Sequence, residues 1–309
     1  MAALTAENVG LVGLGAMGKG AADNLIAKGF PLIGYDVRPE MRTWLEERGG
    51  KYAESLADLG RQCPVVVSFV VNDAQTEEIL FGENALLGSL ATGSIFVACS
   101  TMPPAYVSKL GERLAAHSIN LIDAPVSGGA AGAAKGTLAV MGAGDPAVFA
   151  HVKPVLEAFG ANIYHLGDKP GAGAQLKVLN QLLCGVHLAA AGEALAFARR
   201  QGLPLVMTLE ILRSGAANSW MLGDRGPRMV EEAFGNVTSA VDIFVKDLGL
   251  VLDAAKDARF SAPLASTAYN AFLSVSGRGM GRWDDSAVTC DYLTEPYAGE
   301  ISFPKDKSK

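Results

Sequence analysis

The stretch Val9-Gly-Leu-Val12-Gly13-Leu-Gly15-Ala-Met-Gly18 passes from a short apolar run into three spaced glycines, and helix-forming residues follow it. In a strand–turn–helix unit with this spacing, the first glycine permits the tight turn and the second lets the backbone approach a pyrophosphate. The third lets the helix pack against the sheet. The acidic residue Asp36 stands about 20 residues downstream, as this fingerprint requires. The sequence therefore predicts a dinucleotide-binding βαβ unit.

Asp36 follows a second apolar run, Pro31–Tyr35, and bears on the choice between the two nicotinamide dinucleotides. Its carboxylate can accept hydrogen bonds from the ribose hydroxyls of NAD and repels the extra phosphate of NADP. Arg38 favours the opposite choice, because a guanidinium beside the ribose can pair with that phosphate. We expect NAD as the cofactor, with NADP the less favoured alternative. The competing interpretation of the whole motif is an ordinary glycine-rich turn.

Composition indicates a compact protein with more than one domain. The chain has 309 residues, 50% of them hydrophobic and 19% charged, and this length exceeds that of a usual single domain. A net charge of −6 argues against a nucleic-acid partner, which needs a basic face. The cysteines lack the paired spacing of metal or redox motifs, so we predict buried, reduced thiols and no metal site. These cysteines are Cys63, Cys99, Cys184 and Cys290.

The sequence predicts a cytoplasmic protein without a membrane span. The first strand starts by about residue 9, which leaves no room for a secretory signal. The most apolar long stretch, Ala172–Ala198, contains Lys177, His187 and Glu193. Charged residues are costly within a membrane, so we interpret this stretch as a buried helix.

Strand-like and helical segments alternate up to about residue 165, which predicts a doubly wound parallel sheet of the Rossmann type. The expected later strands are Val65–Val71, Ser94–Ala98, Asn120–Asp123, Thr137–Met141 and Asn162–His165. The turn-rich segment Gly167–Gly171 ends this pattern. Only helices are expected beyond it, at Ala172–Gln201, Pro204–Ser214, Gly226–Glu232, Ala240–Asp257 and Ser261–Ser276. We predict a dinucleotide-binding domain at residues 1–168 and an all-helical domain at 169–309, with fraying from about Arg282.

The helix that follows Gly171 carries a polar stripe on an otherwise apolar surface. At 100° per residue, Lys177, Asn180, Gln181 and His187 fall on one side of it. The simplest explanation is a solvent-facing stripe. Such a stripe normally carries Glu and Lys pairs, whereas a helix joining two domains is expected to face the cleft between them. A lysine desolvated in a cleft is suited to exchange a proton with an alcohol near neutral pH.

Four motifs together resemble the β-hydroxyacid dehydrogenase family, which includes 3-hydroxyisobutyrate, tartronate semialdehyde and L-threonate dehydrogenases. The resemblance extends over nearly the whole chain. It implies a Rossmann domain, a helical substrate domain and hydride transfer between a hydroxy acid and a nicotinamide. The motifs are Gly13-Leu-Gly15-Ala-Met17-Gly18, Asp123-Ala-Pro-Val-Ser127-Gly128-Gly129, Gly171-Ala-Gly173 with Lys177 and Asn180, and Lys246-Asp247-Leu248.

By this resemblance, Ser127 and the backbone amides of Gly128 and Gly129 hold the substrate carboxylate. The assignment is physically reasonable, because successive small residues leave amides open to an anion and the serine hydroxyl adds a donor. The alternative is a glycine-rich turn that closes the strand Asn120–Asp123.

The resemblance also makes Lys177 the general acid/base and Asn180 the residue that orients substrate hydroxyls. Many family members have two asparagines here, whereas this chain has Asn180-Gln181. Together with His187, this pair resembles the L-threonate dehydrogenase branch, and more polar groups in the pocket suit a polyhydroxylated acid. Gln181 is therefore a predicted substrate contact. His187 could equally be a core histidine bonded to a carbonyl.

The remaining predicted cofactor contacts also come from the resemblance. Met17 accompanies the glycines in the first motif, and Thr101 would lie near the nicotinamide ribose. Lys246 would reach the cofactor from the helical domain, with Asp247 beside it. The alternative for Lys246 is a solvated surface charge pair. Trp220 either walls the pocket or is an ordinary core aromatic.

Taken together, these features predict an NAD-dependent enzyme that oxidises a short hydroxy acid, most simply a four-carbon sugar acid such as L-threonate. The alternatives within the family are 3-hydroxyisobutyrate dehydrogenase and tartronate semialdehyde reductase. A non-catalytic dinucleotide-binding module is the alternative outside it. An apolar helical domain also favours a homodimer or homotetramer.

Overall fold

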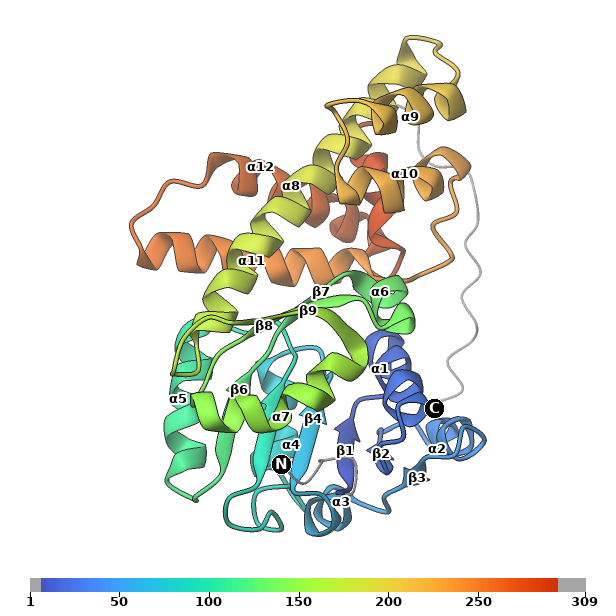
Figure 1. Ribbon diagram of the computed structural model, residues 1–309. Coiled ribbons are helices and arrows are strands. Elements are labelled where there is room, and N and C mark those ends of the chain that lie inside the picture. The colour runs from blue at the N-terminus through green and yellow to red at the C-terminus, as the bar shows by residue number, and fades with distance from the viewer. Residues whose placement is uncertain (1–6, 294–309) are drawn as a thin grey trace. The chain divides into compact units, whose positions relative to one another are not determined.

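The computed structural model describes residues 7–293. The chain forms two compact units, Met1–Lys177 and Val178–Lys309. The first unit is built on six parallel strands in the order β3-β2-β1-β4-β5-β6 (Figure 1). These strands are β1 (Val9–Val12), β2 (Leu32–Tyr35), β3 (Lys51–Tyr52), β4 (Val65–Ser68), β5 (Ile95–Ala98) and β6 (Asn120–Asp123). The helices between them are α1 (Ala16–Ala27), α2 (Glu40–Glu46), α3 (Leu56–Gln62), α4 (Asp73–Phe81) and α5 (Pro104–Ala115).

Both faces of this sheet are covered, which explains why its strands are continuous apolar runs. In β4, Val65 and Val67 belong to one hydrophobic cluster and Val66 to another, because successive side chains point to opposite faces. The first cluster includes residues of α1 and the later helix α7 (Pro146–Phe159), and the second includes residues of α3, α4 and α5. The result is the predicted doubly wound Rossmann sheet.

The strands end together at one edge of the sheet. Direct pairing places Val12 beside Tyr35 and Ser68, Ser68 beside Ala98, and Ala98 beside Asp123. The strand order reverses between β1 and β4, and ligands of open α/β sheets bind outside the carboxyl ends of the strands at such a point. The residues that follow these five strand ends are therefore the first candidates for a binding site.

A second, three-stranded sheet in the order β7-β8-β9 completes the first unit. It contains β7 (Val126–Ser127), β8 (Leu138–Gly142) and β9 (Gly160–His165), with α6 (Gly129–Lys135) after β7. Helix α6 packs against α1, because a Cβ atom added at Gly20 would lie 2.5 Å from the carbonyl carbon of Ala133. The Asn24 amide donates to the carbonyl oxygens of both Gly20 and Ala133 at 2.8 Å. The two glycine-rich turns that precede α1 and α6 are thus joined through their helices.

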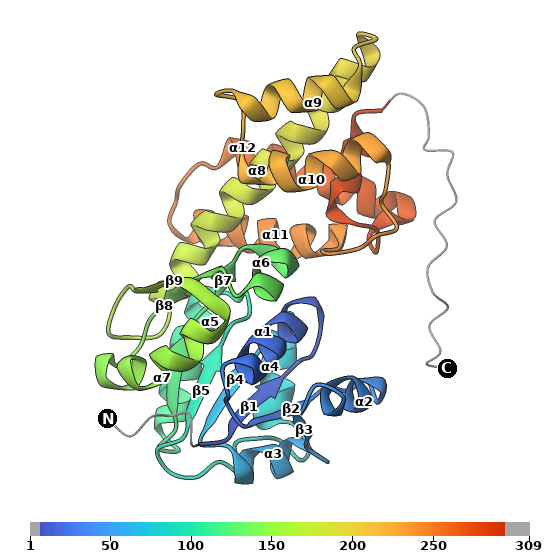
Figure 2. The same cartoon turned by 45° about the vertical axis from the view of Figure 1, so that its right-hand side comes forward.

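The second unit is helical over the residues that the structure describes (Figure 2). Helix α8 (Ala172–Arg200) starts in the first unit and continues into this one, followed by α9 (Leu205–Ser214), α10 (Trp220–Glu231), α11 (Val241–Asp257) and α12 (Pro263–Val275). A π-helical turn (Ser276–Met280) and a 3₁₀ helix (Asp285–Asp291) follow. Helices α11 and α12 stack the rings of Phe244 and Phe272 at 5.0 Å. Gly185 lets Leu248 approach α8, since a Cβ there would lie 2.7 Å from its Cδ2.

Two ion pairs hold the start of the 3₁₀ helix against α10 in this unit. Arg225 forms a two-pronged pair with Asp285 at 2.8 and 3.1 Å, and Arg228 donates to Asp284 at 3.0 Å. The Asp284 and Asp285 side chains are fully buried. The prediction that the chain frays from about Arg282 is therefore wrong for this segment, while residues 294–309 lie outside the described part of the chain.

The predicted fold class is confirmed, and most predicted elements end within a few residues of the observed ones. The largest error concerns α10, which begins at Trp220 rather than Gly226 because the Ser219 hydroxyl caps it, accepting from the Leu222 amide at 3.0 Å. None of the four cysteines forms a disulfide; Cys184 is half-buried and the other three are buried, so the predicted burial holds for three of them.

Among residues 7–293, only α8 is long and apolar enough to cross a membrane, with a mean hydropathy of 1.4 over its most apolar window. Half of that window is buried in the protein, and one such helix is weak evidence for a membrane span.

Candidate active site

The first glycine turn has the geometry that the fingerprint predicts. Gly13 has a φ of +90°, and a Cβ there would lie 2.9 Å from the carbonyl oxygen of Phe69. A Cβ at Gly18 would lie 1.8 Å from the carbonyl oxygen of Gly13. Gly15 differs from both, because a Cβ there would meet no described atom within 4 Å. Gly13 and Gly18 are therefore required for packing, whereas Gly15 keeps a space open.

That open space lies at the start of α1, where Gly15 is the N-cap residue. No side-chain hydrogen bond caps α1, and its first turn holds no acidic residue within the described chain. Its first backbone N–H groups and the positive end of its dipole thus remain available to an anion. Met17 lies in this turn and packs partly against the core. These features fit the pyrophosphate of a dinucleotide.

Asp36 follows β2 at the same edge and is 9% exposed. Its carboxylate accepts from the backbone amides of Leu14 at 2.7 Å and Arg38 at 2.9 Å. The Arg38 guanidinium also donates to both carboxylate oxygens, at 2.8 and 3.0 Å. Burial raises the pKa of Asp36, but the hydrogen bonds and charge of Arg38 and the Leu14 amide outweigh it, so the pKa is lowered below its usual value. Arg38 is thus paired with Asp36.

Two further groups of predicted residues lie in the first unit. Thr101 follows β5 by three residues and is half-buried. Ser127 ends β7, and Gly128 and Gly129 have φ values of +131° and +63°, which favour glycine. Gly128 is the N-cap residue of α6, without a side-chain cap among the described residues. The glycines of this turn are therefore used as backbone, in agreement with the predicted mode of carboxylate binding.

Lys177 lies in the second turn of α8, and only 7% of it is exposed. A lysine is seldom so buried, so the simple explanation of a solvent-facing stripe does not hold for this residue. Asp123 has no role predicted from the sequence, yet its carboxylate accepts from backbone amides at the start of α8.

The predicted residues of the second unit form one hydrogen-bonded chain. Asn180 donates through its amide to the Gln181 side-chain oxygen at 2.8 Å, and Gln181 donates to Asp247. Lys246 donates to the other oxygen of Asp247 at 2.6 Å. Asp247 is 2% exposed, so the Lys246–Asp247 pair is not the solvated surface pair that the sequence left open. Asp247 therefore fixes the side chains of both Gln181 and Lys246.

Two residues with open interpretations are exposed. Trp220 is 54% exposed, with the Arg225 guanidinium 5.8 Å from its ring centroid, so it is not a core aromatic. His187 is also exposed, which excludes the interpretation as a buried core histidine.

Two family models match the chain. Residues 8–167 match the NAD-binding domain of 6-phosphogluconate dehydrogenase, and residues 171–290 match the NAD-binding region of NADP-dependent 3-hydroxyisobutyrate dehydrogenase. Both models describe a nicotinamide dinucleotide-binding protein, so such a dinucleotide is the cofactor.

Individual proteins resemble the chain over most of its length. It is 43% identical to an L-threonate dehydrogenase of Cupriavidus necator over 91% of this chain and 95% of the relative. A crystal structure of a 3-hydroxyisobutyrate dehydrogenase from Salmonella typhimurium has a TM-score of 0.88 and 43% identity, over 92% of this chain and 99% of the other. Psf3, solved with NADP+, has a TM-score of 0.84 and 26% identity, over 91% and 98%. These similarities do not separate NAD from NADP.

The contrast between Gly15 and Gly18 gives a prediction. Gly15→Ala should change the free energy of unfolding by no more than about 1 kcal/mol, because its Cβ enters open space. It should weaken dinucleotide affinity at least ~10-fold by occupying the phosphate position. Gly18→Ala should destabilise the fold by at least ~3 kcal/mol, because the Gly13 carbonyl cannot move freely. Thermal unfolding measures the stability of each variant, and NADH fluorescence titration measures its dinucleotide affinity. A folded Gly15→Ala variant that still binds NADH tightly would contradict the assignment of Gly15 to the phosphate position.

Proposed function

This chain belongs to the 3-hydroxyisobutyrate dehydrogenase family of nicotinamide-dependent oxidoreductases, and we propose that it oxidises L-threonate to the corresponding 2-oxo acid. The observation that carries the proposal is the similarity to L-threonate dehydrogenase over nine-tenths of the chain. The open phosphate position at Gly15 and the buried Lys177 supply the physical support.

The proposed reaction removes two hydrogens from the carbinol carbon and oxygen beside the substrate carboxylate. A nicotinamide ring, when bound, accepts the carbinol hydrogen as a hydride. The Lys177 amine, in its neutral form, takes the hydroxyl proton as the C–O bond becomes a carbonyl. A lysine that is almost fully buried suits this role, because its amine is shielded from bulk water, which would otherwise compete for the proton.

Substrate recognition is proposed to use Ser127, Gly128, Gly129 and Asn180. The Ser127 hydroxyl and the amides of Gly128 and Gly129 would hold the carboxylate, since the turn offers backbone donors at a helix start. Asn180 would orient a substrate hydroxyl, with Gln181 supporting its amide from the next position. A pocket that hydrogen-bonds hydroxyl groups rejects substrates that lack them, because its buried polar groups would be left unpaired. This favours a sugar acid over the methyl-branched 3-hydroxyisobutyrate.

The experiment compares steady-state rates of NAD reduction with three substrates: L-threonate, 3-hydroxyisobutyrate and glycerate, which is the alcohol formed when tartronate semialdehyde is reduced. We expect the highest kcat/KM with L-threonate. Lys177→Ala should lower kcat by at least ~100-fold while dinucleotide affinity is kept, because only proton transfer is lost. Lys169→Ala is the matched control, since this exposed lysine precedes the same helix.

Two results would contradict this function in different ways. A higher kcat/KM with 3-hydroxyisobutyrate would reject the substrate and leave the chemistry intact. A fully active Lys177→Ala variant would reject the general acid/base.

We also propose that the enzyme prefers NAD to NADP, with Thr101 and Lys246 as further cofactor contacts. The carboxylate of Asp36 carries the preference, because its lowered pKa keeps it negative near neutral pH, where it repels a ribose phosphate. Arg38 is held by this carboxylate through two hydrogen bonds and is therefore directed away from such a phosphate.

Removing Asp36 should release Arg38 and invert the preference. We expect Asp36→Ala to raise the ratio of kcat/KM for NADP over NAD at least ~10-fold, because the released Arg38 guanidinium can then pair with the ribose phosphate of NADP. The control is Asp36→Ala combined with Arg38→Ala, which should lose affinity for NAD without gaining NADP. An unchanged ratio in the single variant would show that Asp36 does not select the cofactor.

We also propose where the two domains divide and in which compartment the protein lies. We place the boundary after Asp168, supported by the turn between β9 and α8, although the compact units divide within α8. We place the protein in the cytoplasm, which is compatible with four free thiols.

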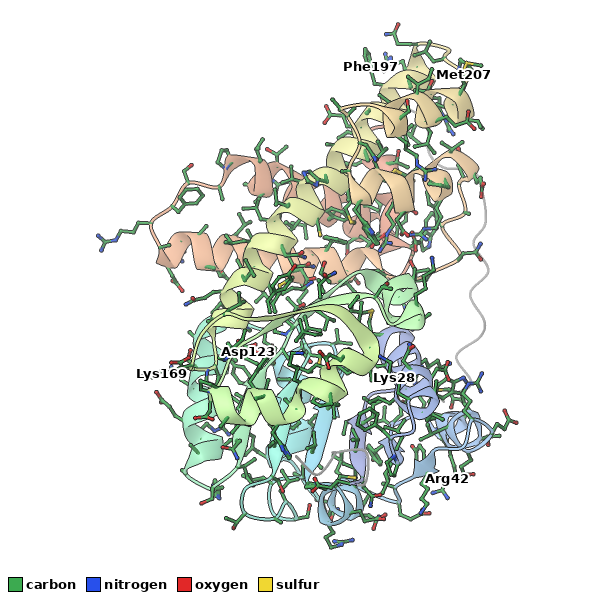
Figure 3. All side chains as sticks on the ribbon, viewed as in Figure 1. Lys28, Arg42, Asp123, Lys169, Phe197 and Met207 are labelled. Carbon is green, nitrogen blue, oxygen red and sulfur yellow. The ribbon has the colours of Figure 1, made fainter. Side chains whose placement is uncertain are left out.

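We propose that two copies associate through one face of α8. Leu179, Leu183 and Phe197 on this face are 53–62% exposed, and Ala190 and Ala194 between them are exposed as well. With His187, these residues form a mainly apolar stripe beside the exposed Glu193, and a protein exposed to water seldom leaves such a run of large apolar side chains open. Leu179 and Leu183 of its first half are large, whereas Ala190 and Ala194 of its second half are small, so an antiparallel pairing of two copies would set large residues against small ones. Helix α9, which follows α8, also carries an exposed apolar residue, Met207, at 57% (Figure 3).

This association is testable by mass. Light scattering after gel filtration should give at least twice the chain mass of 32.1 kDa. Leu183→Glu should yield the single-chain mass, because it buries an unpaired charge in the contact. Tyr164→Glu alters an equally exposed apolar residue of β9 and should leave the mass unchanged. A wild-type protein with the mass of one chain would reject the interface.

A further inference from the structure

Asp123 ends β6, and its buried carboxylate is bonded to the start of a helix far along the chain. Only 1% of the residue is exposed. Its Oδ2 atom accepts from the backbone amides of Gly171 and Ala174, each at 2.9 Å and about 50 residues away in sequence. Figure 3 labels Asp123 within the first unit. Gly171 directly precedes α8 and Ala174 lies in its first turn, whose N–H groups have no intrahelical partner. Asp123 therefore caps α8 from the sheet.

The chain fits tightly around this cap. Gly171 has a φ of +111°, which brings its amide toward the carboxylate at little conformational cost. A Cβ at Gly173 would lie 2.3 Å from the Met141 carbonyl oxygen and 3.0 Å from Oδ2 of Asp123. The first turn of α8 thus lies directly on the sheet, and a small change there would displace it.

The position of this turn determines the position of Lys177. Lys177 follows Gly173 by one helical turn and lies on the same face of α8. Asp123 also belongs to the row of strand ends that carries Gly13, Asp36 and Thr101 after neighbouring strands. A single carboxylate therefore connects the edge of the proposed cofactor site to the helix of the proposed general acid/base. All of these residues belong to the first compact unit.

We propose that Asp123 is a positioning residue for catalysis: by bonding the first amides of α8, it fixes where the Lys177 amine stands relative to the carboxyl edge of the sheet. This inference rests on the proposed role of Lys177. Asp123 is assigned a positioning role and not a catalytic one, because its Oδ2 atom is bonded to the backbone at the start of α8.

Burial raises the pKa of Asp123 to about 6, and the amides of Ala174, Gly171 and Gly173 act against this rise. The carboxylate is thus ionised at pH 8, where the experiments are best done.

Three variants test the inference. Asp123→Ala removes the acceptor, and Asp123→Asn keeps one acceptor oxygen. Asp145→Ala is the matched control, because Asp145 caps α7 in the same unit through the amides of Ala147 and Val148, at 2.9 and 3.0 Å. For each variant, kcat, dinucleotide affinity, the unfolding temperature and amide hydrogen exchange at residues 172–177 are measured.

We expect Asp123→Ala to lower kcat ~10–100-fold, since a displacement of about 1 Å in a catalytic group has such an effect. Dinucleotide affinity should stay within ~3-fold of the wild-type value, and amide hydrogen exchange at residues 172–177 should become faster than in the wild type. Asp145→Ala should lower the unfolding temperature without changing kcat or exchange in this segment. For Asp123→Asn, kcat and the protection of residues 172–177 from hydrogen exchange should change together. If this protection falls, kcat should fall as well; if it is kept, kcat should be kept.

A variant that loosens the turn but keeps kcat within ~2-fold of wild type would overturn the inference. So would a loss of activity explained wholly by weaker dinucleotide binding. If Asp123→Ala does not fold, Asp123→Asn decides by the same relation. Full activity of Lys177→Ala would instead reject the proposed function, so the two failures are distinguishable.

Discussion

The in-register ending of five parallel strands is the constraint on which the proposed site depends. Because the pairings align Val12, Tyr35, Ser68, Ala98 and Asp123 in one row, whatever follows each strand emerges at the same edge. The glycine turn, Asp36 and Thr101 come from three separate loops, yet the sheet places them along one line. Hydrogen bonding between strands fixes this row, so the loops can change in sequence without losing their common origin. The sheet supplies the position, and the loops supply the chemistry.

Close backbone contacts join the two glycine turns of the first unit. Gly18 packs against the Gly13 carbonyl, and two residues later Gly20 packs against the backbone of Ala133 in α6. Helix α1 therefore begins at the phosphate turn and contacts the helix that begins at the Gly128 turn. Because neither contact leaves room for a side chain, the distance between the two turns is set by backbone atoms, which cannot adjust by changing rotamer. The proposed cofactor turn and the proposed carboxylate turn are consequently held as one rigid piece.

Sequence patterns were sufficient for the sheet, the glycine turn and the change from strands to helices, because each is encoded by neighbouring residues. They were insufficient where the partner is distant. Asp123 gained its role from amides about 50 positions later, and the segment after Arg282 is ordered by Arg225 and Arg228 of α10. The early start of α10 depends on a single cap at Ser219, outside the apolar period. Periodicity also cannot tell an exposed aromatic such as Trp220 from a buried one.

Two buried carboxylates hold the polar residues of α8, and each holds a residue with a different proposed role. Asp123 holds the turn that carries Lys177, whereas Asp247 holds Gln181, and through it the amide of Asn180. In the proposed mechanism, Lys177 moves the proton and Asn180 selects the substrate hydroxyl group. Proton transfer therefore depends on Asp123, whereas substrate selectivity depends on Asp247. Substitutions around Asp247 could then alter the preferred hydroxy acid while proton transfer is retained.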